Sequence, residues 1–424
     1  MAEVNTNNDQ YNADELEAPE WLNADFIRKV LSQYENEPKL KVLDVKNSPA
    51  TKKADHYASV MFRTSVDYHT EKGQFFKSLI VKAMPEQEGH KKDMLSESHI
   101  FETEIGMYAK VLPEFEKILQ QAGDHTKLNA NCIYYSLEPR KVLIFEDLLP
   151  LGYNLIRNRN ATHEEVSCVY AKLATWHAAS LKLQNEQPEF LKEFKYGLFE
   201  MPNFKNDPFV TTGMAAFLKL LDEKPEFANY RPFFEKMKNN YIQHLEAIMT
   251  EYRTNRHPDG YYVLSHGDFH LGNMMYKYNK ETGAVDDCML VDFQICNLSP
   301  ITIDLIYSLY TLMGPEDRLY NWDKLYEFYF KSLLANLKKI GYKGTYPTLD
   351  GFWKQIYRHK YFDFQLVTTF LPLAWAVRTK GFGVIDLIEK EDVRHKTYRI
   401  DGYLNDLKVL LPRYEKLGYF DDLQ

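Results

Sequence analysis

The change of hydrophobic periodicity near Pro150 is the feature that most restricts the fold of this 424-residue chain. Before Pro150, apolar residues alternate in short runs separated by turn-rich segments. These runs predict strands over residues 40–45, 57–66, 75–83, 132–137 and 142–145. One helical pattern, over residues 96–112, interrupts the strands and is expected to stop at Pro113 because proline breaks a helix interior.

After Pro150 the pattern becomes that of long helices with an embedded strand-rich island at residues 261–293. The helices are expected over 163–183, 231–252, 322–340 and 397–411. This order indicates an α+β protein with a β-rich N-terminal lobe, a mainly helical C-terminal lobe and a cleft between them. The expected organisation is a flexible tail at 1–18, an N-terminal lobe at 19–148 and a helical lobe at 149–424.

Composition and charge exclude several classes of protein. The 52 basic and 60 acidic residues give a net charge of −8, which disfavours a nucleic-acid partner. Four cysteines without zinc-type spacing argue against a disulfide scaffold or a zinc centre. The acidic N-terminus has no signal-peptide pattern, and no apolar stretch is long enough to cross a bilayer. We therefore expect a cytoplasmic protein with no membrane insertion.

The densest chemistry lies in the run His-Gly-Asp-Phe-His-Leu-Gly-Asn at 266–273. Asp268 and Asn273 are five residues apart in a polar loop after an apolar strand, and Asp292 follows the next apolar run. Phosphoryl transfer requires such a set, with one carboxylate to orient the attacking hydroxyl and two further oxygen ligands for Mg²⁺. The alternative is a polar turn in which Asp and Asn serve only as turn residues.

A kinase also needs a cation near the phosphates, and Lys82 ends the apolar run Leu-Ile-Val-Lys. A lysine in this position can equally extend into solvent. On the expected helix at 96–112, Glu104 lies at the rim of the apolar face, where a carboxylate is either a solvated flank or an ion-pair partner for Lys82. Glu97 is the second choice, and Glu102 points away.

The segment Leu-Ile-Phe-Glu-Asp-Leu at 143–148 is an apolar strand that ends in acids. Backbone groups near Glu146 and Leu148 are candidates to bond the edge of an adenine ring. An ordinary strand end is an equally good interpretation of this segment alone.

With these residues identified, the sequence resembles the ecdysteroid kinase-like family of insect small-molecule kinases, relatives of choline kinases and aminoglycoside phosphotransferases. The resemblance spans residues 19–416 and is strongest at 266–273, 292–294, 145–148 and 173–180. It implies a bilobal protein-kinase-like fold with a nucleotide-binding sheet in the N-terminal lobe and the catalytic loop and acceptor pocket in the helical lobe.

The resemblance also implies roles for individual residues. Asp268 is similar to the family's catalytic base, and Asn273 and Asp292 to its magnesium ligands. The ATP-binding residues it implies are Ser59, Lys82, Glu104, Glu146 and Leu148. By the same resemblance, His177, Ser180 and Asp304 are expected to be structural, with Asp304 fixing the catalytic loop.

One departure from the family pattern concerns the turn between the first two strands. The family has a glycine there, whereas residues 47–59 contain none. Close approach of backbone amides to the phosphates is therefore expected to be weaker, and ATP affinity lower.

Two functions follow from these observations. The first is an ATP- and Mg²⁺-dependent kinase whose acceptor is a hydroxyl of an ecdysteroid or of a xenobiotic marked for detoxification. The second is a catalytically weak pseudokinase that binds nucleotide or a lipophilic ligand. Aromatic residues of the helical part are candidates to line an apolar acceptor pocket, although each of them also suits the core: Tyr307, Tyr310, Tyr361, Phe362, Phe364, Phe370 and Trp375. A cationic acceptor such as choline would require an acid beside them.

Overall fold

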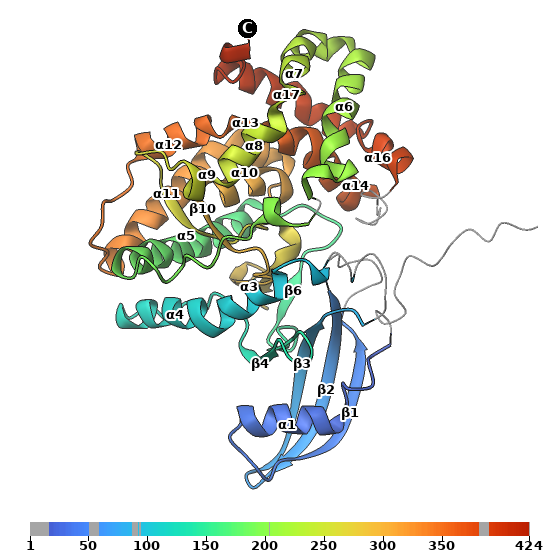
Figure 1. The fold of residues 1–424 in the computed structure, drawn as a ribbon, viewed down its shortest axis with the longest axis vertical. Coiled ribbons are helices and arrows are strands. Elements are labelled where there is room, and N and C mark those ends of the chain that lie inside the picture. The colour runs from blue at the N-terminus through green and yellow to red at the C-terminus, as the bar shows by residue number, and fades with distance from the viewer. Residues whose placement is uncertain are drawn as a thin grey trace, which may run out of the picture. The chain divides into compact units, whose positions relative to one another are not determined.

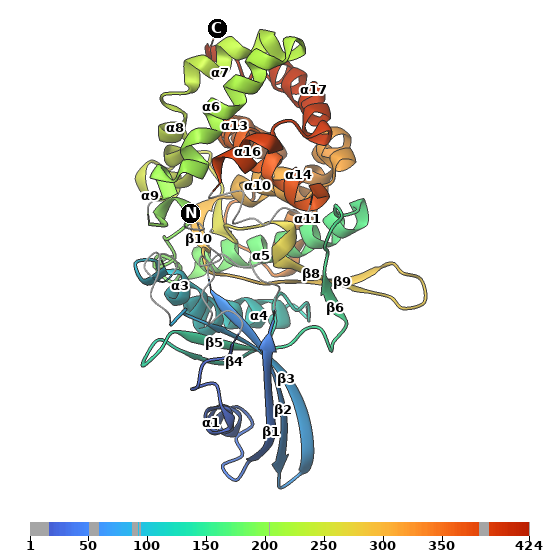
Figure 2. The same ribbon diagram turned by 90° about the vertical axis from the view of Figure 1, so that its right-hand side faces the viewer.

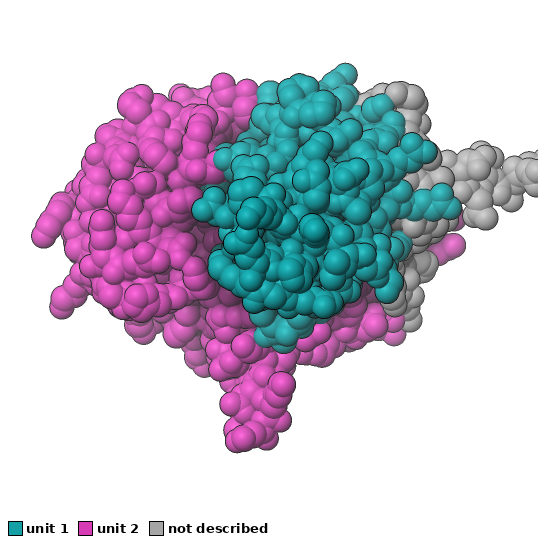
Figure 3. Space-filling view, turned by 90° about the horizontal axis from the view of Figure 1, so that it is seen from below, with its two compact units in different colours: residues 1–108, 130–152 teal, residues 109–129, 153–424 magenta. Residues whose placement is uncertain are grey.

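The computed structural model describes residues 17–50, 59–86, 92, 95–202, 204–380 and 390–423. It divides into two compact units, which Figure 3 colours separately. Unit 1 comprises residues 1–108 and 130–152, and unit 2 comprises residues 109–129 and 153–424. Among the described residues, no helix has both the length and the apolar character needed to cross a membrane.

Unit 1 is built on a five-stranded antiparallel sheet in the order β1-β2-β3-β5-β4 (Figures 1 and 2). Its elements are α1 Ala24–Tyr34, β1 Lys41–Pro49, β2 Val60–Thr70, β3 Gly73–Ala83, α3 Ile100–Gly106, β4 Cys132–Ser136 and β5 Val142–Glu146. Buried and more exposed residues alternate along β2, as expected for a strand with one face in a core. Ile27, Val30 and Leu31 of α1 pack with the sheet residues to form that core.

Unit 2 contains most of the helices and two small sheets, in the strand orders β10-β7 and β6-β8-β9. Its strands are β6 Tyr153–Leu155, β7 Tyr262–Ser265, β8 Met274–Tyr278, β9 Val285–Leu290 and β10 Asn297–Pro300. Its α-helices are α4 Leu112–Gln121, α5 His163–Glu186, α6 Pro208–Glu223, α7 Arg231–Met237, α8 Tyr241–Met249, α9 Glu251–Thr254, α10 Thr302–Thr311, α11 Trp322–Lys339, α12 Leu349–Arg358, α13 Lys360–Gln365, α14 Leu371–Lys380, α16 Glu391–Thr397 and α17 Asp401–Lys416.

The long helix α5 is the central element of unit 2. A capping box begins it, because Thr162 and Glu165 satisfy each other's backbone N–H groups. Most of its residues are buried, and it packs along α11 in the view of Figure 1. The turn of the β8–β9 hairpin projects from the unit (Figure 2).

These elements confirm the α+β class, with a β-rich N-terminal unit and a mainly helical C-terminal unit. Several boundaries differ from expectation, and two of the differences have a clear physical cause. Pro113 does not end a helix, because a π-helical turn at Met107–Val111 precedes it and the proline falls in the first turn of α4, where its missing N–H is not needed. The helix expected over 231–252 is broken at residues 238–240, where two asparagines of weak helix propensity occur.

Candidate functional site

The loop that follows β7 turns sharply at Gly267. This residue has φ +84°, and a Cβ atom built there would lie 2.4 Å from the carbonyl oxygen of Ile295. Only glycine fits both the left-handed conformation and the close approach of the neighbouring backbone. The turn directs the chain from strand β7 into Asp268.

Asp304, on α10, anchors the start of this loop through hydrogen bonds. Its carboxylate accepts the backbone N–H groups of His266 at 2.8 Å and Gly267 at 2.9 Å. His177 of α5 lies 3.1 Å from the same carboxylate through Nε2, and its Nδ1 is 2.6 Å from the Tyr329 hydroxyl. Asp304 and His177 are fully buried, so their hydrogen bonds fix the start of the loop to the helical core.

Asp268 is surrounded by polar groups but keeps contact with solvent, since its side chain is 21% exposed. The Tyr307 hydroxyl donates to Oδ1 at 3.0 Å, and the Asn273 amide donates to Oδ2 at 3.1 Å. His270 Nε2 lies 3.4 Å from Oδ2. The carboxylate is therefore held in one orientation while remaining accessible.

The electrostatics of the loop favour an ionised Asp268. Burial by itself raises the pKa of this carboxyl, but His270, His266 and the Tyr307 hydrogen bond outweigh it and lower the pKa to about 2. Burial opposes charge on His270, yet the attraction of Asp268 and Asp292 raises its pKa. Asp268 is thus ready to accept a hydrogen bond from a hydroxyl at neutral pH.

A backbone hydrogen bond joins the segment that contains Asn273 to the segment that ends in Asp292. The N–H of Val291 donates to the carbonyl oxygen of Asn273 at 3.1 Å, which places the end of the β9 segment beside the loop. Asp292 then adopts φ +68°, an unfavourable conformation for a non-glycine residue. Such strain is concentrated at functional sites.

Asn273 and Asp292 supply the hard oxygen donors that Mg²⁺ prefers. The nitrogen of the Asn273 amide donates to Asp268, so its carbonyl oxygen is directed away from that carboxylate. Among the described residues, no group of three or more His, Cys, Asp or Glu side chains is positioned to hold a metal. Mg²⁺ needs few protein ligands because it keeps waters and binds phosphate oxygens, so the pair fits an ion held jointly with a nucleotide.

In unit 1, Lys82 and Glu104 form a buried ion pair. Nζ of Lys82, on β3, lies 2.6 Å from Oε2 of Glu104, on α3, and the two side chains are 5% and 2% exposed. The expected pairing is thus observed. Glu97 precedes the first residue of α3, and Glu102 pairs with Lys141 at 2.7 Å, so neither takes the place of Glu104.

The other expected nucleotide-binding residues also lie in unit 1. Glu146 ends β5, and its carboxylate accepts the Asn131 N–H at 2.7 Å. Leu148 is buried two residues further on, and Ser59 is buried just before β2. The glycine-free turn between β1 and β2 falls mainly on residues 51–58, which lie outside the described residues.

Asp147, between Glu146 and Leu148, was not anticipated as a structural anchor. Its carboxylate accepts hydrogen bonds from Arg63 Nε and from the Ser78 hydroxyl, both at 2.7 Å. Burial raises its pKa, but these donors reverse the effect and hold the pKa below its ordinary value. Asp147 therefore fixes the strand end that carries the proposed adenine-binding backbone.

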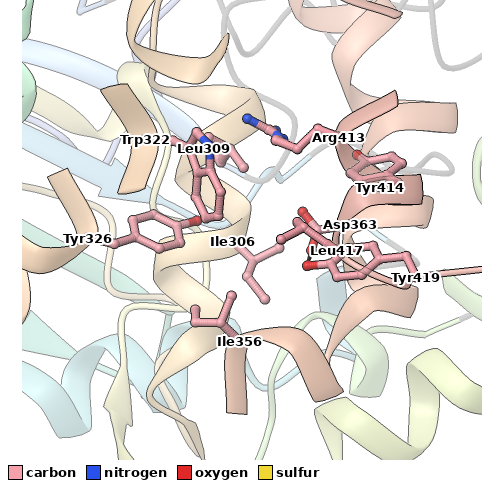
Figure 4. A pocket seen from close by; sticks show the side chains of 10 residues that line it. All are labelled: Ile306, Leu309, Trp322, Tyr326, Ile356, Asp363, Arg413, Tyr414, Leu417 and Tyr419. Atoms are coloured by element: carbon pink, nitrogen blue, oxygen red, sulfur yellow. Dashed lines mark hydrogen bonds between the residues drawn. The ribbon is translucent and has the colours of Figure 1, made fainter. Parts of the chain in front are cut away.

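Aromatic side chains line several cavities among the described residues of unit 2. One of these cavities adjoins the loop at 266–273 and is lined by Gly267, Tyr307 and Phe362, among others. Another, shown in Figure 4, lies among α10, α11 and α17. There, Asp363 and Tyr419 point toward one another, with the hydroxyl 3.2 Å from the carboxylate, and Tyr310 donates to Asp363 at 2.6 Å.

The contact between Tyr307 and Asp268 is the functional feature that the sequence interpretation missed. Tyr307 was considered only as one of several aromatic residues around an apolar pocket. A usable signal existed, because Tyr307 follows Asp304 by three residues and so lies on the same side of α10. This spacing indicates that Tyr307 lies on the side of α10 that faces the loop, but it does not specify that the hydroxyl meets Asp268.

Known proteins resemble this chain at the level of family and of structure. Solved structures of an aminoglycoside 2′-phosphotransferase IIIa align with TM-scores of 0.39 to 0.40. A point mutant in complex with GDP is 12% identical, and the match covers 91% of this chain and 100% of that one. The wild-type GDP complex is 11% identical, and the match covers 91% of this chain and 99% of that one. The complex with GDP and kanamycin is 12% identical, with 86% and 98% covered. No curated protein sequence matches. The model of the ecdysteroid kinase-like family matches residues 53–342, well over half of the sequence, and the chain belongs to that family.

Proposed function

We propose that this protein is an ATP- and Mg²⁺-dependent phosphotransferase that phosphorylates a hydroxyl of a small molecule, an ecdysteroid or a xenobiotic. The observation that carries the proposal is that the Val291–Asn273 backbone hydrogen bond sets the segment with Asp292 beside the loop that holds Asp268 and Asn273. The chemistry that Mg²⁺ would supply there is neutralisation of the negative charge on the phosphates. Asn273 and Asp292 would hold the ion, and Asp268 would orient the acceptor hydroxyl.

The nucleotide side of the proposal rests on unit 1. Lys82, oriented by its ion pair with Glu104, would contact the α- and β-phosphates. Backbone groups at Glu146 and Leu148 would bond the adenine edge, and Ser59 would lie near the phosphates. A cytoplasmic enzyme of this kind would store or inactivate a hormone, or make a foreign compound more polar for disposal.

The first test compares purified wild type with Asp268→Asn in a screen of ecdysteroids, choline and plant phenols for Mg²⁺-dependent ADP release. Loss of a positioned base costs about 10²–10⁴-fold in rate, and we expect that loss with Mg-ATP affinity retained. Asp259→Asn is the matched control, because Asp259 is an exposed acid in the turn before β7. An Asp268→Asn enzyme with wild-type turnover contradicts the assignment.

The alternative is a pseudokinase, and the absence of glycine from residues 47–59 is the observation in its favour. It predicts that calorimetry detects nucleotide or ligand binding while no tested alcohol supports ADP release. Asp268→Asn would then change neither quantity. The comparison of wild type with Asp268→Asn therefore distinguishes the kinase from the pseudokinase.

A further inference from the structure

Two of the four cysteines of this chain meet in unit 2, although they are far apart in the sequence. Cys168 is on α5 and Cys288 is on β9, and the helix packs against the strand. Their thiols hydrogen-bond to each other, and neither cysteine is in a disulfide. The fold therefore brings two reduced sulfur atoms into contact.

The two cysteines of this pair differ in their access to solvent. Cys168 is partly exposed, whereas Cys288 is fully buried. On its strand, Cys288 lies opposite the equally buried Tyr276 of β8. A small oxidant in solution therefore reaches the pair through the Cys168 sulfur, and Cys288 is placed to react with its neighbour rather than with the solvent.

A buried cation is fixed beside the pair. Lys172 lies one turn after Cys168 on α5, and its ammonium donates to the carbonyl oxygen of Cys288 and, at 2.7 Å, to Oδ1 of Asp287. These bonds hold the positive charge between the helix and the strand that carry the two thiols. Glu164 and Asp287 are the acids whose negative charges act on Cys168.

These surroundings give the two thiols different reactivity. The hydrogen bond with Cys288 and the charge of Lys172 outweigh burial and the nearby acids, and they lower the pKa of the Cys168 thiol. The same hydrogen bond, together with burial, raises the pKa of Cys288 well above its ordinary value. Because the thiolate is the nucleophilic form, Cys168 suits the first attack, and Cys288 suits a thiol that reacts second.

Cys132 in unit 1 is a natural comparison, because it is also partly exposed. Its sulfur donates to the carbonyl oxygen of Tyr134 at 3.5 Å instead of meeting a thiol. Burial and the charge of Glu104 raise its pKa to about 12. Partial exposure alone therefore does not make a cysteine of this chain reactive, whereas the thiol pair and its cation do.

We propose that Cys168 and Cys288 form a redox site, in which Cys168 reacts with a hydroperoxide and Cys288 then closes a reversible disulfide between α5 and β9. This inference goes beyond the phosphotransferase activity and does not depend on it. The bond would join α5 to the strand that leads to Asp292. In a reducing compartment such a bond is transient, as is typical of redox-sensing disulfides.

The reaction balances with peroxide as the only oxidant. The Cys168 thiolate attacks one oxygen of hydrogen peroxide, the O–O bond breaks, and the hydroxide that leaves takes up a proton to become water. Cys168 is then a sulfenic acid. The Cys288 sulfur attacks the sulfenic sulfur, the S–O bond breaks, and the hydroxyl leaves as water with the Cys288 proton. Two thiols lose two electrons, and one peroxide becomes two waters.

The first test uses the reduced full-length wild type, which contains its own control. With limiting iodoacetamide at pH 7, peptide mass spectrometry should show Cys168 alkylated at least about tenfold faster than Cys132. Hydrogen peroxide should lower the number of free thiols from four to two, with a 168–288 link in the peptide map. Dithiothreitol should restore all four thiols.

Three variants separate the steps. Cys288→Ser should retain a sulfenic acid at Cys168 that dimedone captures, because no second thiol removes it. Cys168→Ser should form no disulfide, and Cys132→Ser, the matched control, should behave like wild type. If the buried serine of Cys288→Ser prevents folding, the wild-type measurements decide. The proposal is overturned if Cys132 is alkylated as fast as Cys168, or if peroxide produces no 168–288 link in wild type.

Discussion

Glu104 in unit 1 and Asp268 in unit 2 are both carboxylates with a proposed role in phosphoryl transfer, but their surroundings differ. Glu104 is buried against the Lys82 ammonium, whereas Asp268 is 21% exposed and is held mainly by the neutral donors Tyr307 and Asn273. A buried ion pair is costly to break because either charge alone is poorly solvated. A partly exposed carboxylate can exchange one donor for another. The first arrangement suits a permanent support, and the second suits contact with a substrate.

The largest expected effect is on the stability of unit 1. Glu104→Ala removes the carboxylate that faces Lys82 and should lower the free energy of unfolding by about 3–5 kcal/mol, measured by urea denaturation. Glu71→Ala is the control, because the Lys39–Glu71 pair of the same unit is 2.7 Å long but exposed, and such pairs contribute about 0.5 kcal/mol or less. Equal losses would show that burial does not distinguish the two pairs.

The second-largest effect concerns Asp304, which holds the loop that carries Asp268 in unit 2. Asp304→Ala leaves the buried N–H groups of His266 and Gly267 without their acceptor, at about 1–3 kcal/mol each. We expect a loss of about 2–4 kcal/mol in unfolding free energy and a lower kcat with little change in KM for ATP. Asp304→Asn keeps one oxygen acceptor, so its losses in unfolding free energy and in kcat should both be smaller. Undiminished kcat in a folded Asp304→Ala protein would contradict the role of Asp304 in holding the loop.

The smallest expected effect is on the pH dependence of stability, and it differs between two buried carboxylates. Asp147 in unit 1 has a lowered pKa, whereas burial raises the pKa of Asp363 in unit 2 to about 6 despite hydrogen bonds from Tyr310 and Tyr419. The difference follows from the partners, because Arg63 contacts Asp147 directly and the bonds to Asp363 come from phenols. Of these two carboxyls, only Asp147, which has a direct cationic partner, has a pKa below its ordinary value.

The two shifts have opposite consequences for stability. The raised pKa of Asp363 contributes stability below its unfolded pKa of 3.8, and this is lost as pH rises through about 6, by ~2–3 kcal/mol at most. The contribution of Asp147 is present above pH 3.8 and is lost as pH falls below that value. Relative to wild type, Asp363→Asn should therefore gain stability as pH rises from about 4 to 7. Asp147→Asn should be less stable than wild type by a nearly constant amount over that range, and the difference should shrink only below pH 3.8. Parallel denaturation profiles of the two variants would contradict the assignment.

The sequence was most informative where structure depends on neighbouring residues. Strand positions in unit 1 were predicted from alternating apolar residues, an alternation that the structure shows as alternating burial along β2. The predicted helix start at residue 163 matches α5, which a capping box of Thr162 and Glu165 begins. The pairing of Lys82 with Glu104 was also predictable, since the helical wheel brings Glu104 to the edge of the apolar face. The start of α1 is likewise a local feature, because the Asn23 side chain accepts the Phe26 N–H and caps the helix that begins at Ala24.

Local spacing within the chain determined the polar loop at 266–273, the carboxylate after β9 and the change from strands to helices, because each depends on residues a few positions apart. Tertiary structure alone decided that the Tyr307 hydroxyl meets Asp268 across 39 positions, that Arg253 neutralises Glu200 across 53, and that Arg63 rather than a phenol faces Asp147. Such contacts depend on how α10, the segment at 197–200 and the sheet pack, and hydrophobic periodicity specifies which faces are buried but not which polar groups meet there.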